Sequence, residues 1–142
     1  MGTPRGIRVY DDFAHHPTAV SKTLAGLRRR HPQGKLLALF EAKSATACRK
    51  LHQEDYVGAF AAADIVLLAP LGRDGLSEDE RLDTQKLARD LVQAGKRAYA
   101  FSDLDSLVES TKEYATDGDV VAVLSNGAFG GVQQRLVAAL EG

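Results

Sequence analysis

Three short segments of the chain concentrate side chains that can do chemistry. The first reads Asp11-Asp12-Phe13-Ala14-His15-His16-Pro17 and holds two carboxylates and two imidazoles within six residues. A carboxylate here can accept hydrogen bonds from ribose hydroxyls, and a histidine can donate to a phosphate oxygen or a carboxylate. Asp and His are also metal ligands, although this spacing matches no closed ligand set. A plain turn capped by an aspartate remains the structural interpretation.

The second segment combines cations with hydroxyls and reads Glu41-Ala42-Lys43-Ser44-Ala45-Thr46-Ala47-Cys48-Arg49-Lys50. Lys43 and Arg49 supply positive charge, and Ser44 and Thr46 supply hydroxyls that orient a bound group, so the pattern is typical of a carboxylate site. The first turn of a helix with ordinary surface bases would produce the same composition.

The third segment is glycine-rich and reads Ser125-Asn126-Gly127-Ala128-Phe129-Gly130-Gly131. Glycines between a strand and a helix let backbone N–H groups approach an anion at the helix N-terminus. The spacing is neither that of a dinucleotide fingerprint nor that of a P-loop, and the sequence has no Gly-Lys-Ser/Thr. A simple tight turn is the alternative.

Apolar runs and amphipathic segments alternate along the whole chain. The predicted strands are Ile7–Tyr10, Lys35–Phe40, Asp64–Ala69, Arg97–Phe101 and Val120–Leu124. The predicted helices are Thr18–Arg30, Asp55–Ala63, Ser77–Ala94, Asp103–Tyr114 and Gly131–Leu140. This alternation predicts a single α/β domain, a doubly wound and mostly parallel sheet with helices on both faces. Ligands bind such sheets beyond the carboxyl ends of the strands, where all three segments lie.

The bulk composition excludes several classes of protein. The 142 residues suit one domain with a single core, and 18 basic against 19 acidic residues give no field that favours nucleic acid or anionic lipid. The single cysteine excludes an internal disulfide, no run reaches the roughly 18 apolar residues of a membrane span, and we expect a cytoplasmic protein. The run Arg28–Arg30 could form a phosphate patch, but it is interpreted as a solvated helix terminus, where cations complement the helix dipole.

Taken together and in this order, the three segments resemble the C-terminal domain of the Mur ligase family. The resemblance extends from Ile7 to the last predicted helix. It implies a Rossmann-like domain, residues 1–142, of an ATP-dependent amide ligase whose central ATPase and N-terminal UDP-binding domains lie outside this sequence. The implied reaction joins the murein peptide L-alanyl-γ-D-glutamyl-meso-diaminopimelate to UDP-N-acetylmuramate in peptidoglycan recycling. L-alanine is the alternative acceptor.

The resemblance also implies individual roles. Asp12 would hold the ATP ribose, His15 would lie near the terminal phosphate, and His16 would face the junction with the incoming amine. The residues implied to bind the peptide are Lys43 and Arg49 as a carboxylate clamp, Ser44 and Thr46 beside them, and Ser125, Asn126 and Phe129. The family pattern has proline and arginine where this chain has Ala42 and Lys43, and a histidine near Gln133. Lysine keeps the charge of arginine but loses its bidentate fork.

The implied chemistry is activation of the UDP-muramoyl carboxylate by ATP as an acyl phosphate, which the amine of the peptide then attacks. Phosphoryl transfer depends on Mg²⁺ and a P-loop lysine. Because this sequence has no P-loop, we expect ATP and Mg²⁺ to be bound mainly by the other domains and the isolated chain to be inactive. Two further hypotheses remain: a free-standing small-molecule or nucleotide-binding module, and a metal-dependent phosphoesterase that uses the aspartates and histidines of the first segment.

Overall fold

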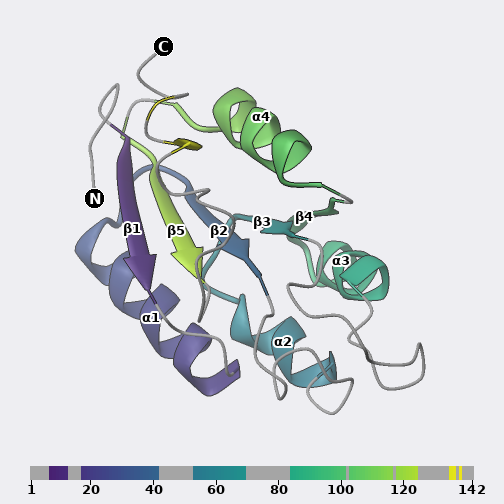
Figure 1. The fold of residues 1–142 in the computed structure, drawn as a ribbon. Helices are drawn as coiled ribbons and strands as arrows, with labels where there is room; N and C mark the ends of the chain where they lie inside the picture. Colours follow the sequence, from purple (N-terminus) through teal and green to yellow (C-terminus); the bar gives the residue numbers. More distant parts are fainter. Residues whose placement is uncertain are drawn as a thin grey trace.

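A computed structural model describes residues 7–12, 17–41, 53–69, 84–101, 103–116, 118–124, 135–136 and 138 of the chain. The strands are β1 (Arg8–Asp12), β2 (Leu36–Phe40), β3 (Ile65–Leu68), β4 (Arg97–Ala100) and β5 (Val120–Leu124). The helices are α1 (Pro17–Arg30), α2 (Gln53–Ala59), α3 (Thr84–Gln93) and α4 (Leu104–Tyr114). All five strands are parallel, in the order β1-β5-β2-β3-β4 (Figure 1).

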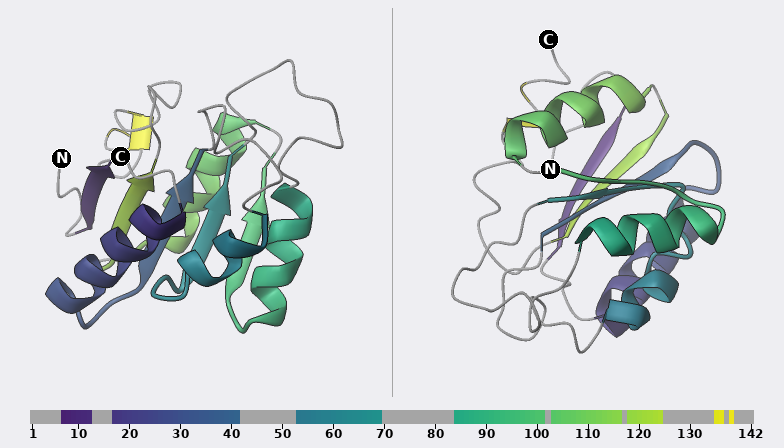
Figure 2. Two further views of the ribbon diagram at one scale, coloured as in Figure 1. Left: turned by 90° about the horizontal axis from the view of Figure 1, so that it is seen from below. Right: turned by 90° about the vertical axis from the view of Figure 1, so that its right-hand side faces the viewer.

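Helices cover both faces of the sheet, which confirms the predicted doubly wound architecture. Figure 2 shows α1, α2 and α3 on one face and α4 on the other. Successive residues of β2 contribute alternately to the two cores: Leu36, Ala38 and Phe40 pack towards α1–α3, while Leu37 and Leu39 pack on the α4 side. A strand buried on both faces must be apolar throughout, which explains the uninterrupted apolar run in its sequence.

Local signals place the helix ends. Pro17 is the first residue of α1, where a missing N–H costs nothing. Gly95 follows α3 with a φ of 92°, the left-handed conformation that ends helices, and the backbone N–H of Lys96 donates to the carbonyl of Leu91. Asp103 caps α4 by accepting a hydrogen bond of 2.7 Å from the backbone N–H of Ser106.

Several predicted boundaries were wrong. Strand β1 continues through Asp12 rather than ending at Tyr10, because its last two residues pair with β5. Helix α2 ends at Ala59 rather than Ala63, and α3 ends at Gln93 rather than Ala94. The predicted start of α3 at Ser77 and most of the last predicted helix lie outside the described residues.

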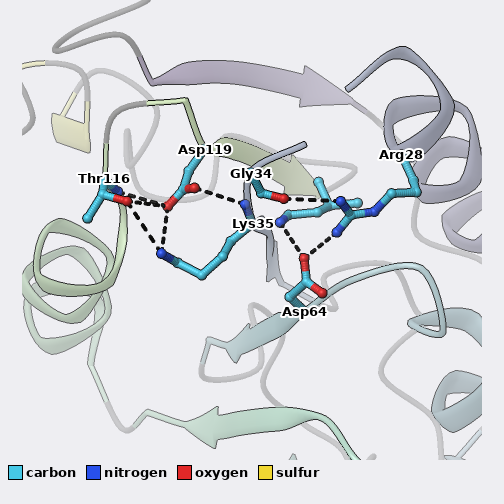
Figure 3. A network of polar contacts seen from close by, with 7 residues as sticks. Arg28, Gly34, Lys35, Asp64, Thr116 and Asp119 are labelled. Carbon is cyan, nitrogen blue, oxygen red and sulfur yellow. Dashed lines mark hydrogen bonds and ion pairs between the residues drawn. The ribbon is translucent and has the colours of Figure 1, made fainter. Parts of the chain in front are cut away.

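A polar network connects the amino ends of β2, β3 and β5 (Figure 3). The buried carboxylate of Asp119 accepts hydrogen bonds from the backbone N–H groups of Lys35, at 2.8 Å, and Thr116, at 2.9 Å. Asp64 accepts from the backbone N–H of Leu36, at 2.9 Å, and pairs with Arg28. Arg28 lies in the last turn of α1 and is partly exposed, as predicted, and its pair with Asp64 is a contact that the sequence did not predict. The network ties the β2 and β5 ends to the turns beside them.

Candidate functional site

Three neighbouring strands end in register at the carboxyl edge of the sheet. Asp12 of β1 and Phe40 of β2 both pair with Leu124 of β5, which lies between them. The three segments predicted to bind ligands follow these residues directly. Because neighbouring strands are about 4.8 Å apart, the three segments begin within roughly 10 Å of one another. We call this edge the carboxyl rim, and the predicted convergence of the segments on one side of the sheet is confirmed at their starting points.

Backbone hydrogen bonds extend the sheet one residue beyond the strand ends on three neighbouring strands. The N–H of Glu41 donates to the carbonyl of Leu124 at 3.0 Å, and that of Ala69 donates to Phe40 at 2.9 Å. Phe101 makes the same contact with Leu68, also at 2.9 Å. The carboxyl rim is therefore a fixed platform from which the predicted binding segments depart.

An aromatic cluster holds the end of β2 against α2. The ring centroid of Phe40 lies 5.0 Å from that of Tyr56 and 5.5 Å from that of Phe60, the latter pair meeting edge to face. All three side chains are almost fully buried. Offset and edge-to-face ring pairs are favoured by the aromatic quadrupole. The segment with Lys43 and Arg49 is thus bounded on each side by firmly packed structure.

Glu41 is a second feature of the carboxyl rim that the sequence analysis did not single out. Its side chain is buried, with 6% of the residue exposed, directly after the last residue of β2. A carboxylate is rarely buried unless it has a compensating interaction, and Glu41 has one. Its position immediately after a fully apolar strand is the sequence signal that could have drawn attention to it.

An open hollow of about 480 Å³ lies between the first two turns of α1 and helix α2, next to the carboxyl rim. Its lining combines hydroxyls, one cation and one carboxylate: Pro17, Thr18, Ser21, Lys22, Asp55 and Ala59. Sequence reasoning missed these residues because they belong to two helices separated by more than twenty residues. The only sequence signal was that Thr18, Ser21 and Lys22 repeat at the spacing of one helical face.

The structure locates one of the predicted site residues. Asp12 is the last residue of β1, so its backbone is at the carboxyl rim, although its side chain is not described. The other predicted residues lie outside the described ranges: His15, His16, Lys43, Ser44, Thr46, Arg49, Ser125, Asn126 and Phe129. Among the residues that the structure describes, no three His, Cys, Asp or Glu side chains gather to hold a metal ion, and no helix could span a membrane.

The parallel, doubly wound sheet, in which β1, β5 and β2 end side by side, places the chain in the class of α/β domains that commonly bind ligands beyond the carboxyl ends of their strands. A sequence model of the Mur ligase family, described as its glutamate ligase domain, matches residues 1–127. The chain belongs to the Mur ligase family.

Relatives in two subgroups of that family are similar over nearly the whole chain. The UDP-N-acetylmuramate–L-alanyl-γ-D-glutamyl-meso-2,6-diaminoheptandioate ligase of Haemophilus influenzae is 36% identical over 138 residues, which are 96% of this chain and 28% of that protein. The UDP-N-acetylmuramate–L-alanine ligase of a Synechococcus strain is 33% identical over 95% of this chain and 30% of its own length. The chain thus spans less than a third of these relatives.

Solved structures give the same result. A murein peptide ligase from Psychrobacter arcticus matches 99% of this chain with a TM-score of 0.81 and 29% identity, over 29% of its own length. A domain from a Haemophilus ducreyi protein, described as a ligase for the same tripeptide, matches with a TM-score of 0.75 and 30% identity. That match covers 98% of this chain and 95% of the domain. The fold described above is therefore that of a single Mur ligase domain.

Proposed function

We propose that this chain is the C-terminal, substrate-binding domain of an ATP-dependent ligase that joins L-alanyl-γ-D-glutamyl-meso-diaminopimelate to UDP-N-acetylmuramate. The observation that carries the proposal is the register of Asp12, Leu124 and Phe40, from which the three family-like segments depart side by side. The similarity to murein-peptide ligases over 96% of the chain supports the choice of substrate. Such a reaction belongs in the cytoplasm and in peptidoglycan recycling.

The strand order suggests a division of labour along the carboxyl rim. β1 leads into the segment with Asp12, His15 and His16, which we assign to the nucleotide and its terminal phosphate. β2 leads into the cationic segment, which we assign to a carboxylate of the incoming peptide. β5 lies between them, so its glycine-rich segment would lie where the two ligands meet. This order supports a site in which an amine is directed at an activated carboxylate.

The domain would bind and orient rather than activate. ATP, when bound, supplies the phosphoryl group that makes the muramoyl carboxylate reactive. Backbone N–H groups of the glycine-rich segment suit an anion, and lysine and arginine side chains suit a carboxylate. We assign Mg²⁺ to the other domains of the ligase, because phosphoryl transfer in this class of enzyme uses a P-loop that this sequence does not contain. The chain alone is then expected to show no ligase turnover.

The test uses the full-length parent enzyme. Asp12→Ala should raise the KM for ATP, whereas Lys43→Ala and Arg49→Ala should raise the KM for the peptide. Each loses a hydrogen bond to or from a charged group, about 1.5–3 kcal/mol or roughly ten- to a hundredfold. Lys112→Ala, at the end of α4 on the opposite face, is the matched control and should leave both constants unchanged. Unaltered kinetics in all three site variants would remove the support for the assignment.

L-alanine is the second candidate acceptor, because L-alanine-adding relatives are 29–36% identical to this chain. Competition between the tripeptide and L-alanine in the parent enzyme distinguishes the two: preferential consumption of L-alanine would overturn the proposed substrate.

The two hypotheses of another class, the free-standing binding module and the metal-dependent phosphoesterase, have their own tests. A parent reading frame without a P-loop domain would favour a free-standing binding module, and stoichiometric metal in the purified protein would favour a phosphoesterase.

A further inference from the structure

A second groove runs along the opposite flank of α1, between this helix and the edge strand β1. Its volume is about 290 Å³, and Tyr10, Leu27 and Arg30 are among the residues that line it. Figure 1 shows α1 crossing the sheet beside β1. β1 pairs only with β5 among the described strands, so this flank of the domain is an edge. The groove shares Asp11 with the first of the three segments and Lys22 with the hollow at the carboxyl rim, but its other end, at Arg30, has no part in the proposed ligase function.

The helix side of the groove is a stripe of three residues one turn apart, Lys22, Gly26 and Arg30. Residues spaced by four lie on one helical face, and a rise of 1.5 Å per residue separates the two cations by about 12 Å along the axis. A Cβ placed on Gly26 would have no atom within 4 Å. The centre of the stripe is therefore open, and its two ends are positively charged.

Positive charge accumulates at the end of the groove nearest the amino ends of the strands. Tyr10 and the exposed Arg8 are two residues apart on β1 and so share its α1 side. The hydroxyl of Tyr10 is 2.8 Å from Nε2 of His31, the residue after α1. Arg30 is the last residue of α1 and directly precedes His31, so Arg8, Arg30 and the imidazole lie on the same flank of the domain. Desolvation lowers the pKa of His31, and the positive charges of Arg8 and Arg30 lower it further.

These arginines differ from the other charged residues around them. Arg28, two residues before Arg30, pairs with Asp64, but within the described residues neither Arg8 nor Arg30 has a carboxylate partner. The dipole of α1 favours cations at its last turn. It accounts for neither Arg8, which belongs to β1, nor the open groove that leads away from Arg30. Two guanidinium groups beside an imidazole suit a phosphate dianion, which accepts several charge-assisted hydrogen bonds at once.

We propose that this groove is a binding site for a phosphate-bearing small molecule, separate from the carboxyl rim. The phosphate would lie between Arg8, Arg30 and His31, and the body of the ligand would extend over Gly26 towards Lys22. The phosphate position is at the C-terminal end of α1, and the first turn of the same helix adjoins the carboxyl rim. A ligand of this class would therefore contact a helix that also borders the proposed ligase site. Binding in this groove would require a phosphate group on the ligand, and it would not require the ligase substrates to be present.

The experiment uses the 142-residue chain with inorganic phosphate and phenyl phosphate as probes. Calorimetry measures the affinity, and proton NMR follows the His31 ring as a function of pH. Saturable binding of both probes is expected, and each should raise the pKa of His31 because the dianion stabilises the imidazolium. Arg8→Gln/Arg30→Gln should weaken both at least tenfold, whereas Arg29→Gln, the exposed neighbour in sequence, should leave both unchanged.

Gly26→Leu tests the groove separately from the phosphate position. A Cβ at position 26 meets no atom within 4 Å, and leucine has a higher helix propensity than glycine, so the variant should fold at least as well as the parent. It should weaken phenyl phosphate severalfold more than inorganic phosphate. Absence of saturable binding would overturn the proposal, as would binding that persists unchanged in the double arginine variant, which would place the anion at the carboxyl rim. Should the double variant unfold, Arg30→Gln alone, read by the His31 pKa, gives the same decision.

Discussion

Asp119 holds the amino ends of β2 and β5 together through hydrogen bonds rather than through a single ion pair. Its carboxylate accepts from two backbone N–H groups and from the hydroxyl of Thr116 at 3.1 Å, and Lys35 Nζ lies 3.0 Å away. Burial alone would raise the pKa of Asp119, but the hydrogen bonds from Lys35 and Thr116 outweigh burial and lower it. The charged form is therefore the one that the folded chain stabilises.

Asp119→Asn should destabilise the domain by about 1.5–3 kcal/mol at neutral pH, because an amide cannot replace a charged acceptor for all of these donors. A folded-state pKa below the ordinary 3.8 contributes stability above that pH, and the contribution is lost as the pH falls through the lower folded value. The difference between wild type and variant should therefore shrink below about pH 4 in urea titrations. Asp105→Asn, which breaks an exposed pair with Arg135, is the control and should cost less than about 1 kcal/mol. A pH-independent difference for Asp119→Asn would contradict this account.

Gly34 makes the close approach between the turn before β2 and the turn before β5. Its φ is 86°, and a Cβ there would collide with the carbonyl oxygen of Gly118. Gly34→Ala should therefore destabilise the chain by more than the roughly 1–2 kcal/mol of left-handed strain alone. Gly95→Ala is the matched control, since Gly95 has a φ of 92° and open space around its Cβ position. Thermal or urea unfolding measures the loss of stability in each variant. Equal losses for Gly34→Ala and Gly95→Ala would show that the collision with Gly118 adds no cost.

At the scale of elements, the sequence predicted the layers of the domain but not the order of the strands in the sheet. Arg8 on β1 and Arg97 on β4 are exposed and interrupt the apolar pattern, which marks these two strands as edges. β2, β3 and β5 are uniformly apolar and buried, so nothing local tells them apart. The insertion of β5 between β1 and β2 depends on which strands pair across the whole chain. Periodicity within a segment cannot carry that information.

The same contrast applies to the candidate site. Residue types and their place after predicted strands were enough to predict which segments start from the carboxyl rim. The hollow with Lys22 and Asp55 could not be predicted, because it arises from the packing of α1 against α2. Tyr56 was missed for a similar reason: a tyrosine in a short polar helix reads as a surface residue until the neighbouring Phe40 and Phe60 are known to enclose it.

Tyr56 anchors α2, and removing it tests how far that helix depends on the aromatic cluster. Its side chain is fully buried, and its ring contacts those of Phe40 and Phe60. Tyr56→Ala should cost about 3–5 kcal/mol, the range for removing a buried aromatic side chain. Val57→Ala, next to it and only half-buried, should cost less than about 1.5 kcal/mol. Comparable losses in urea unfolding would show that α2 is held by something other than these rings.

At the scale of the molecule, the sheet separates two kinds of polar structure. The amino ends carry the network of Asp64 and Asp119, whose carboxylates accept hydrogen bonds from the backbone of neighbouring turns and strands. These two residues serve the fold. The carboxyl ends of β1, β5 and β2 carry the segments that resemble the binding loops of the family. A rigid amino edge leaves the carboxyl rim free to vary in sequence without loss of the fold. This separation explains how relatives with different acceptors can share one domain architecture.

Lys43 is the position at which a sequence change at the carboxyl rim should alter the KM for the peptide. The family pattern has arginine there, and a guanidinium binds a carboxylate through two parallel hydrogen bonds where an ammonium offers a point charge. If Lys43 clamps the peptide, Lys43→Arg in the parent enzyme should lower the KM for the tripeptide by up to about tenfold, since one added charge-assisted bond contributes about 1.5 kcal/mol. The KM for ATP should not change, and Lys112→Arg, in the last turn of α4, should leave the KM for the peptide unaltered. An unchanged or higher peptide KM for Lys43→Arg would mean that the second segment grips its carboxylate through Arg49 alone, or that it serves a different acceptor.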